Sequence, residues 1–182
     1  MKRKIKIIID NLITIAIAFV VGLVVSRLII SNAVVPTGSM EATVDEKAMI
    51  IVNRTAYWFG EPQRGDIVAF PAPDDKETLY LKRIIGTPGD KVEIKGHQLY
   101  INDIAYKEDY ITIKYPESDI NYGPYTVPDG YYFMLGDNRD ESYDSRFWDH
   151  KYVPLDDIIG KVHFQYIPEF RWFEKVEYIE LN

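Results

Sequence analysis

The sequence contains no cysteine, so it offers no disulfide, no thiolate ligand for zinc and no thiol nucleophile. Only 3 of its 182 residues are histidine, which leaves few candidates for an imidazole base. Basic residues are concentrated near the N-terminus: residues 1–30 carry a net charge of +4, whereas residues 31–182 carry −11. This acidic body argues against a nucleic-acid-binding protein, whose phosphate contacts require a basic surface.

A long apolar run lies near the N-terminus. Residues 11–26 contain no charged side chain, and with Leu28, Ile29 and Ile30 the run reaches the roughly 20 residues that cross a bilayer as a helix. Arg27 is tolerable near one end, where a long side chain can extend to the headgroups. We therefore expect a transmembrane helix at 11–30.

Basic residues at positions 2, 3, 4 and 6 indicate on which side of the membrane this helix begins. We expect a cytoplasmic N-terminus at residues 1–10 and an extracytoplasmic domain at residues 31–182, in a single-pass protein of the cell membrane. No repeat or low-complexity tract divides the body, and its length suits one domain.

A cleaved secretory signal is an alternative, because Ser31-Asn32-Ala33 has small residues at the two positions that matter for cleavage. The apolar region of such signals is roughly 7–15 residues long, so a run of this length favours an uncleaved anchor. A buried core helix fits less well, since the run has no polar face.

The body has the pattern of short strands. Residues 91–95 and 98–101 alternate apolar and polar side chains, and the intervening turn predicts a hairpin. Five further runs are bounded by Gly, Pro, Asp or Asn: AMIIVNR, GDIVAF, TLYLKRIIG, GYYFMLGD and IIGKVHFQYI. We expect a mainly β domain, with residues 106–128 as a long surface excursion.

Two aromatic clusters, Tyr57-Trp58-Phe59 and residues 170–173, have two interpretations. Trp and Tyr favour the headgroup layer of a membrane, but aromatic side chains also commonly pack into cores and strand edges. The sequence leaves both open.

Ser39 lies nine residues beyond Ile30, on the turn Pro36-Thr37-Gly38-Ser39. A serine hydroxyl becomes a nucleophile only when a base removes its proton. The three histidines, His97, His150 and His163, have no triad-like setting in the sequence, so a serine-histidine triad is unsupported.

A lysine can serve as the base if it is neutral. At the ordinary pKa of about 10.4, a fraction of only roughly 10⁻³ to 10⁻⁴ is deprotonated at pH 7. Lys82 is the candidate, since strand alternation puts it on the same face as Tyr80 and Ile84 while Arg83 faces the other way. If the strand packs on a core, one of the two basic residues faces inward, and desolvation then lowers its pKa. Taken alone, a lysine in such a strand is more often exposed.

Four motifs in order favour a catalytic lysine over an exposed one. They are PTGSM after the apolar run, RGDIVAF, YLKRIIGTPGDKV and GDNRDESYDSR. From the apolar run to about residue 165 the chain resembles the type I signal peptidases, the serine-lysine leader peptidases of bacterial membranes. Its compact body is similar to the Gram-positive-type branch. The resemblance implies a β-sandwich or barrel catalytic domain, with no cofactor and no metal.

The resemblance also implies a role for six residues. Ser39 matches the nucleophile and Lys82 the general base, while Thr37 matches a hydroxyl that helps the Ser39 N–H stabilise the oxyanion. Ser142 matches a serine that holds the lysine amine, and Asp144 and Arg146 match a supporting charged pair. One position departs from the family pattern, since Ala42 stands where a proline is frequent.

The substrates implied by the resemblance are signal peptides of exported preproteins, with small residues, typically alanine, one and three positions before the cut. Membrane lipid is the other expected partner, nucleic acid is not, and the oligomeric state is left open. A nucleophile tethered nine residues from the helix end, at most about 30 Å of extended chain, would lie at the bilayer surface where such peptides are cut.

Two alternative functions fit the sequence less well. A self-cleaving serine-lysine peptidase of the repressor type would be soluble and carry a DNA-binding region, where this chain has an apolar anchor. A surface-anchored binding module could use DNRDESYDSR as a calcium loop, but that loop would need glycine at Ser145 and a bidentate Glu at Lys151. The calcium-loop match therefore fails.

Overall fold

The computed structural model describes residues 2–115 and 120–181, with side chains from residue 5 onward. Residues 116–119, in the expected surface excursion, lie outside the described residues, as do Met1 and the side chains of residues 2–4 in the expected cytoplasmic segment. The elements in chain order are α1 (Lys2–Ile29), β1 (Ile30–Val34), η1 (Gly38–Met40), β2 (Met49–Asn53), β3 (Ile67–Pro71), β4 (Leu79–Gly86), β5 (Lys91–Lys95), β6 (Gln98–Ile101), β7 (Ile104–Lys107), β8 (Asn121–Thr126), β9 (Tyr131–Leu135), β10 (Val153–Pro154), η2 (Leu155–Asp157), β11 (Gly160–Ile167), β12 (Arg171–Trp172) and β13 (Ile179–Glu180).

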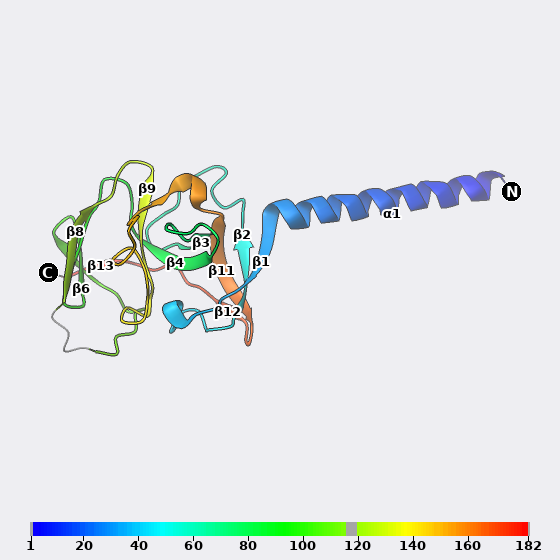
Figure 1. Ribbon diagram of the computed structural model, residues 1–182. Helices are drawn as coiled ribbons and strands as arrows, with labels where there is room; N and C mark the ends of the chain where they lie inside the picture. The colour runs from blue at the N-terminus through cyan, green and yellow to red at the C-terminus, as the bar shows by residue number, and fades with distance from the viewer. Residues whose placement is uncertain (1, 116–119, 182) are drawn as a thin grey trace.

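Two antiparallel sheets form the body (Figure 1). The larger sheet has the order β1-β2-β11-β3-β4-β9-β10 with β12 paired to β11, and the smaller has the order β13-β7-β6-β5-β8. Each of the five runs predicted as strands contains one, and β5 and β6 form the predicted hairpin, with Lys95 opposite Gln98. The mainly β prediction is confirmed.

The surface excursion expected at residues 106–128 is wrong at both ends, and at its start Tyr106 and Lys107 belong to β7. Residues 121–126 form β8, which pairs with β5. Tyr122 and Tyr125 pack against the apolar cluster between the sheets. The sequence does not reveal this strand, because its two tyrosines stand among glycine, proline and asparagine. These three residue types are typical of turns.

Helix α1 projects away from the body as one long rod (Figure 1). Its stretch Ile5–Ile29 has a mean hydropathy of 2.6, is long and apolar enough to cross a membrane, and has none of its most apolar window buried in the protein. The helix begins earlier than the expected span, and Ile30 already belongs to β1. A membrane crossing at these residues stays a prediction.

The strands at the centre of the larger sheet are buried on both faces. In β9, Tyr132 and Met134 pack into one apolar cluster, whereas Phe133 and Leu135 pack into another, between the two sheets. Strand β4 pairs with β9 and shares this double burial. The expected alternation along β4 therefore puts both of its basic residues inside.

In each aromatic cluster, some side chains are exposed and others are held against the body. Phe59 is fully exposed, and Trp58, Phe170 and Trp172 are also exposed. In contrast, the Tyr57 hydroxyl donates a hydrogen bond to Asp66, and Phe173 packs against the core of the larger sheet. For the exposed rings, contact with lipid stays one of the two interpretations.

Candidate active site

Ser39 sits on the single-turn helix η1. Contacts from the chain that follows it and from a distant loop hold this turn in place. The Glu41 N–H donates to Gly38 O at 3.0 Å, and the fully buried side chain of Met40 anchors the turn in the core. From the distant loop, the Asn138 N–H donates to Ser39 O at 3.2 Å and its side-chain amide donates to Gly38 O at 3.0 Å. The backbone around the Ser39 hydroxyl is thus fixed on both sides.

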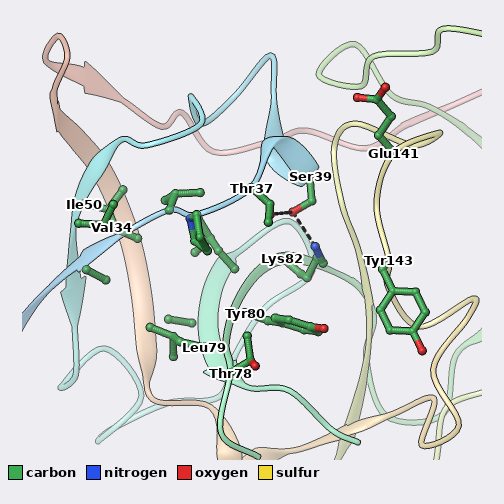
Figure 2. Close-up of a pocket in the computed structure, with 15 residues that line it drawn as sticks. Val34, Thr37, Ser39, Ile50, Thr78, Leu79, Tyr80, Lys82, Glu141 and Tyr143 are labelled. Carbon is green, nitrogen blue, oxygen red and sulfur yellow. Dashed lines mark hydrogen bonds between the residues drawn. The ribbon is translucent and has the colours of Figure 1, made fainter. Parts of the chain in front are cut away.

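Lys82 and Ser39, which lie far apart in the sequence, meet in the structure (Figure 2). The Nζ atom of Lys82 lies 2.6 Å from Ser39 Oγ, within hydrogen-bond distance. Thr37 Oγ1 lies on the other side of the hydroxyl, 3.4 Å from Ser39 Oγ. The side chain of Ser39 is therefore within reach of both residues that the resemblance assigns to it.

The environment of Lys82 favours its neutral form. Burial lowers the pKa of the Lys82 amine to about 8, with Asp144 and Asp137 opposing the shift and Arg146 adding to it. Asp144 and Arg146 are paired with each other, because Arg146 Nε donates to Asp144 Oδ1 at 2.8 Å. Their charges have opposite signs, so their effects on the pKa of the amine oppose each other. At this pKa roughly a tenth of the amine is neutral at pH 7, about a hundredfold more than for an ordinary lysine.

Ser142 lies beside this pair, but its hydroxyl does not bond to the amine. Its Oγ is buried and lacks a hydrogen-bond partner among the described residues. Ser142 and Ser39 pack tightly around Gly136, where a Cβ atom would lie 2.2 Å from Ser142 Oγ and 2.3 Å from Ser39 O. Ser142 and the Ser39 carbonyl thus pack around the same glycine, while the role of Ser142 in holding the lysine stays a prediction.

The expected charged pair is present and holds the same loop. Both Asp144 and Arg146 are buried. Asp144 Oδ2 accepts the Gly136 N–H at 3.1 Å, and Arg146 Nη2 donates to the carbonyl of Arg139 at 2.5 Å. The pair therefore fixes the backbone of residues 136–146 behind Ser39.

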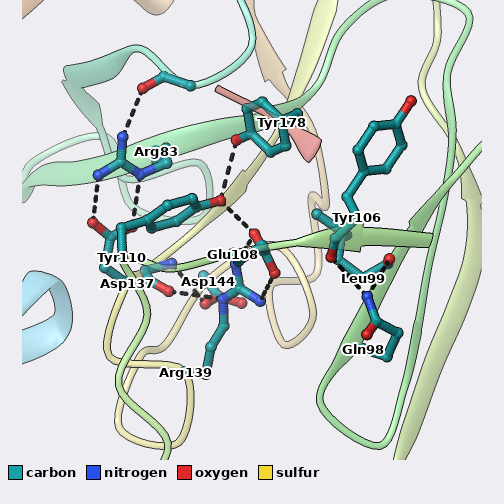
Figure 3. Close-up of polar contacts among 12 residues, drawn as sticks. Arg83, Gln98, Leu99, Tyr106, Glu108, Tyr110, Asp137, Arg139, Asp144 and Tyr178 are labelled. Atoms are coloured by element: carbon teal, nitrogen blue, oxygen red, sulfur yellow. Dashed lines mark hydrogen bonds and ion pairs between the residues drawn. The ribbon is translucent and has the colours of Figure 1, made fainter. Parts of the chain in front are cut away.

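Sequence reasoning missed a second buried network, shown in Figure 3. Arg83 donates to both carboxylate oxygens of Asp137, at 2.9 and 2.6 Å, and its guanidinium carbon lies 4.2 Å from the centre of the Tyr110 ring. Arg139 donates to both oxygens of Glu108, at 2.7 and 2.5 Å, and the Tyr110 hydroxyl also bonds to Glu108.

This network joins the two sheets behind the site. Glu108 directly follows β7 of the smaller sheet, whereas Asp137 and Arg139 flank Asn138 on the loop after β9. Asp137 and Arg139 could have been found, because both stand in the quoted motif GDNRDESYDSR. Glu108 and Tyr110 are isolated polar residues in the sequence, and no local pattern distinguishes them.

Ala42, where the family frequently has proline, adopts a backbone angle that proline cannot. Its φ is 81°, in the left-handed region, whereas the proline ring fixes φ near −65°. The chain after Ser39 therefore follows a path that depends on the absence of proline.

The histidines lie elsewhere, and none of their contacts involves Ser39. His150 Nδ1 lies 3.1 Å from Asp74 Oδ1, and His97 Nε2 lies 2.8 Å from the carbonyl oxygen of Tyr115. His163 stacks on Trp172, with ring centres 5.8 Å apart. Lysine is thus the base that the geometry offers.

The Ser39–Lys82 pair opens onto a cleft that is continuous with solvent. Val34, Ile50 and Leu79 contribute to an apolar wall on one side of the pair (Figure 2). Glu141 and Tyr143, from the loop that carries Ser142, line the opposite side. An extended peptide could therefore pass over the reacting atoms from one side to the other.

Comparisons with known proteins point to one family. The family model described as "Signal peptidase, peptidase S26" matches residues 8–167. A signal peptidase IB of Staphylococcus aureus is 35% identical over 178 residues, which cover 90% of this chain and 91% of the relative. A probable signal peptidase I-2 of Synechocystis is 32% identical over 160 residues, which cover 85% of this chain and 71% of the relative. A crystal structure of a signal peptidase I from Enterococcus faecalis is 36% identical, with a TM-score of 0.47 and coverage of 56% of this chain and 96% of that chain.

Proposed function

The chain belongs to the signal peptidase family, peptidase S26, and is a protease that cleaves signal peptides; we propose that Ser39 is its nucleophile and Lys82 its general base. The observation that carries this proposal is the distance of 2.6 Å between Lys82 Nζ and Ser39 Oγ in a buried site. The repressor-type peptidase and the anchored binding module are not favoured, because the family match covers both the apolar helix and the body.

The proposed reaction has two halves that use the same base. Neutral Lys82 accepts the proton of Ser39 as Oγ attacks the scissile carbonyl, and the resulting ammonium then donates a proton to the leaving amine. The C–N bond breaks, and the signal peptide remains attached to Ser39 as an ester. Lys82 next takes a proton from water as the water oxygen attacks the ester carbonyl. The ester C–O bond then breaks, and the Lys82 ammonium returns a proton to Ser39 Oγ, which releases the signal peptide with a free carboxylate and restores neutral Lys82.

We further propose that α1 spans the membrane with its N-terminus in the cytoplasm and the body outside. The concentration of basic residues at the start of the chain supports this orientation. Strand β1 begins directly after α1 and covers only about 16 Å at roughly 3.3 Å per residue, so Ser39 stays close to the end of the helix. The nucleophile would then face the exported end of a signal peptide held in the same bilayer.

The substrate requirement can be tested with the full chain in detergent. A preprotein with alanine one and three residues before the cut should be cleaved there, and leucine one residue before the cut should slow cleavage by about 10²-fold or more. The reason is that a large side chain beside Ser39 would displace the scissile carbonyl by an ångström or more. Cleavage rates and the sequence of the new N-terminus are the measurements. Equal rates for both preproteins, or a cut elsewhere, would contradict the proposed function.

Thr37 is proposed to help the Ser39 N–H stabilise the oxyanion. Thr37→Val keeps the shape and removes the hydroxyl, so kcat should fall by about 10²- to 10³-fold with little change in KM. Thr37→Ser keeps the hydroxyl and should retain most of the activity. Equal kcat values for the valine variant and the wild type would remove Thr37 from the mechanism.

A further inference from the structure

The cleft has two chemically different ends, and the signal-peptide residues before the cut would occupy only one of them. The apolar wall with Val34, Ile50 and Leu79 suits the small apolar residues before the cut. Beyond Ser39 and Lys82, the lining changes to the carboxylate of Glu141 and the phenol of Tyr143 (Figure 2). A peptide whose scissile carbonyl lies at Ser39 must leave the cleft at this second end.

Glu141 is fixed in position but still accessible. Its Oε2 atom accepts a hydrogen bond of 3.2 Å from the Asn138 amide, which also donates to Gly38 O on the nucleophile turn. Its Oε1 atom lies 2.6 Å from Lys114 Nζ, and the side chains of Glu141 and Lys114 are 47% and 43% exposed. An ion pair this exposed contributes little, so a cation from a substrate can replace Lys114 at small cost.

Tyr143 lies two residues further along the same loop and provides a flat surface on the same side of the cleft, apart from the Glu141 carboxylate (Figure 2). Its ring stacks on Phe147 with 6.3 Å between ring centres and 14° between planes, which restrains it, yet the residue remains 53% exposed. A carboxylate can bind a Lys or Arg side chain through charge, and an accessible aromatic ring can bind one through its face. The body's net charge of −11 acts in the same direction, because it repels acidic segments.

We propose that Glu141 and Tyr143 form the binding site for the first one or two residues after the cut, and that this site favours a basic side chain over an acidic one. The proposal rests on the proposed function, since it takes the direction of the peptide from the cleavage of signal peptides at Ser39. It makes Glu141 a specificity-determining residue for the mature end of the substrate.

The test uses three preproteins that differ only in the second residue after the cut, which is Lys, Gln or Glu. For the full-length wild type in detergent, kcat/KM should be about fivefold higher for the Lys than for the Glu substrate, the size expected for one exposed ion pair. Glu141→Gln should reduce this ratio to below about twofold, and Glu141→Lys should reverse it. Lys114→Gln should increase the ratio, because it removes the competing cation.

The ratio between substrates is the readout, because Glu141 also supports the nucleophile turn through Asn138 and a variant can alter the overall rate. Glu180→Gln removes a carboxylate from β13 in the smaller sheet, away from the cleft, and should leave the wild-type ratio and rate intact. An unchanged Lys-to-Glu ratio in both Glu141 variants, with cleavage still at the expected bond, would overturn this inference alone. Failure of the wild type to cleave any of the three preproteins would instead overturn the proposed function on which it rests.

Discussion

Lys82→Met is expected to lower kcat/KM for a preprotein by at least about 10⁴-fold, because the hydroxyl of Ser39 would lose its proton acceptor. Methionine fills a similar volume without a basic group, so the buried site should stay packed. Lys82→Arg should be equally inactive, since a guanidinium remains protonated and cannot accept the proton. Rates of preprotein cleavage in detergent, together with thermal unfolding of each variant, are the measurements.

Ser39→Ala provides the comparison for these variants. Because nucleophile and base act as a unit, the double variant Ser39→Ala with Lys82→Met should be no slower than either single variant. Lys91→Met, at a partly exposed lysine that pairs with Asp103, should retain wild-type activity. Substantial activity in Lys82→Arg would show that the amine is not the base.

Gly136→Ala is expected to reduce both the cleavage rate and the stability of the fold. The added methyl group would lie 2.2 Å from Ser142 Oγ and 2.3 Å from Ser39 O, so either the nucleophile turn or the Ser142 loop must move. A displacement of about 1 Å at reacting atoms can reduce the rate by about 10²-fold, and overpacking of this kind typically destabilises a protein by about 1–3 kcal/mol.

The matched control is Gly60→Ala, because a Cβ at Gly60 would meet nothing within 4 Å. It should leave the cleavage rate unchanged. Kinetics and denaturant unfolding of the two alanine variants separate loss of catalysis from loss of folding. Wild-type rate and stability in Gly136→Ala would mean that Ser39 and the loop are not held as closely as the structure indicates.

Much of the fold could be predicted from sequence because local patterns specify it. The alternation at residues 91–95 and 98–101 and the turn between them define the hairpin β5–β6, whose register the structure confirms. Strand β8 could not be predicted, since its stability comes from pairing with β5 and from tyrosines packed between the sheets. Such contacts depend on the tertiary fold, which overrides the turn-like composition of residues 121–126.

The site was predictable to a lesser degree. Strand alternation identified Lys82 as a lysine that could be buried, but its contact with Ser39 joins segments far apart in the chain and came only from the family resemblance. The burial of Arg83 depends on its partner Asp137, and that of Arg139 on Glu108, which directly follows a strand of the other sheet. Pairing between distant charges is set by how the sheets pack, so one sequence without its fold does not specify it.

The most direct measurement of the central claim is the pH dependence of kcat/KM, which reports the pKa of the free enzyme, for the wild type with a preprotein that lacks titrating groups near the cut. Burial lowers the pKa of the Lys82 amine to about 8, and only the neutral amine can accept the proton of Ser39. The rate should therefore rise about tenfold per pH unit from pH 6, bend near pH 8 and level off by pH 9. A rate that is constant from pH 6 to pH 9 would contradict a neutral Lys82 as the general base.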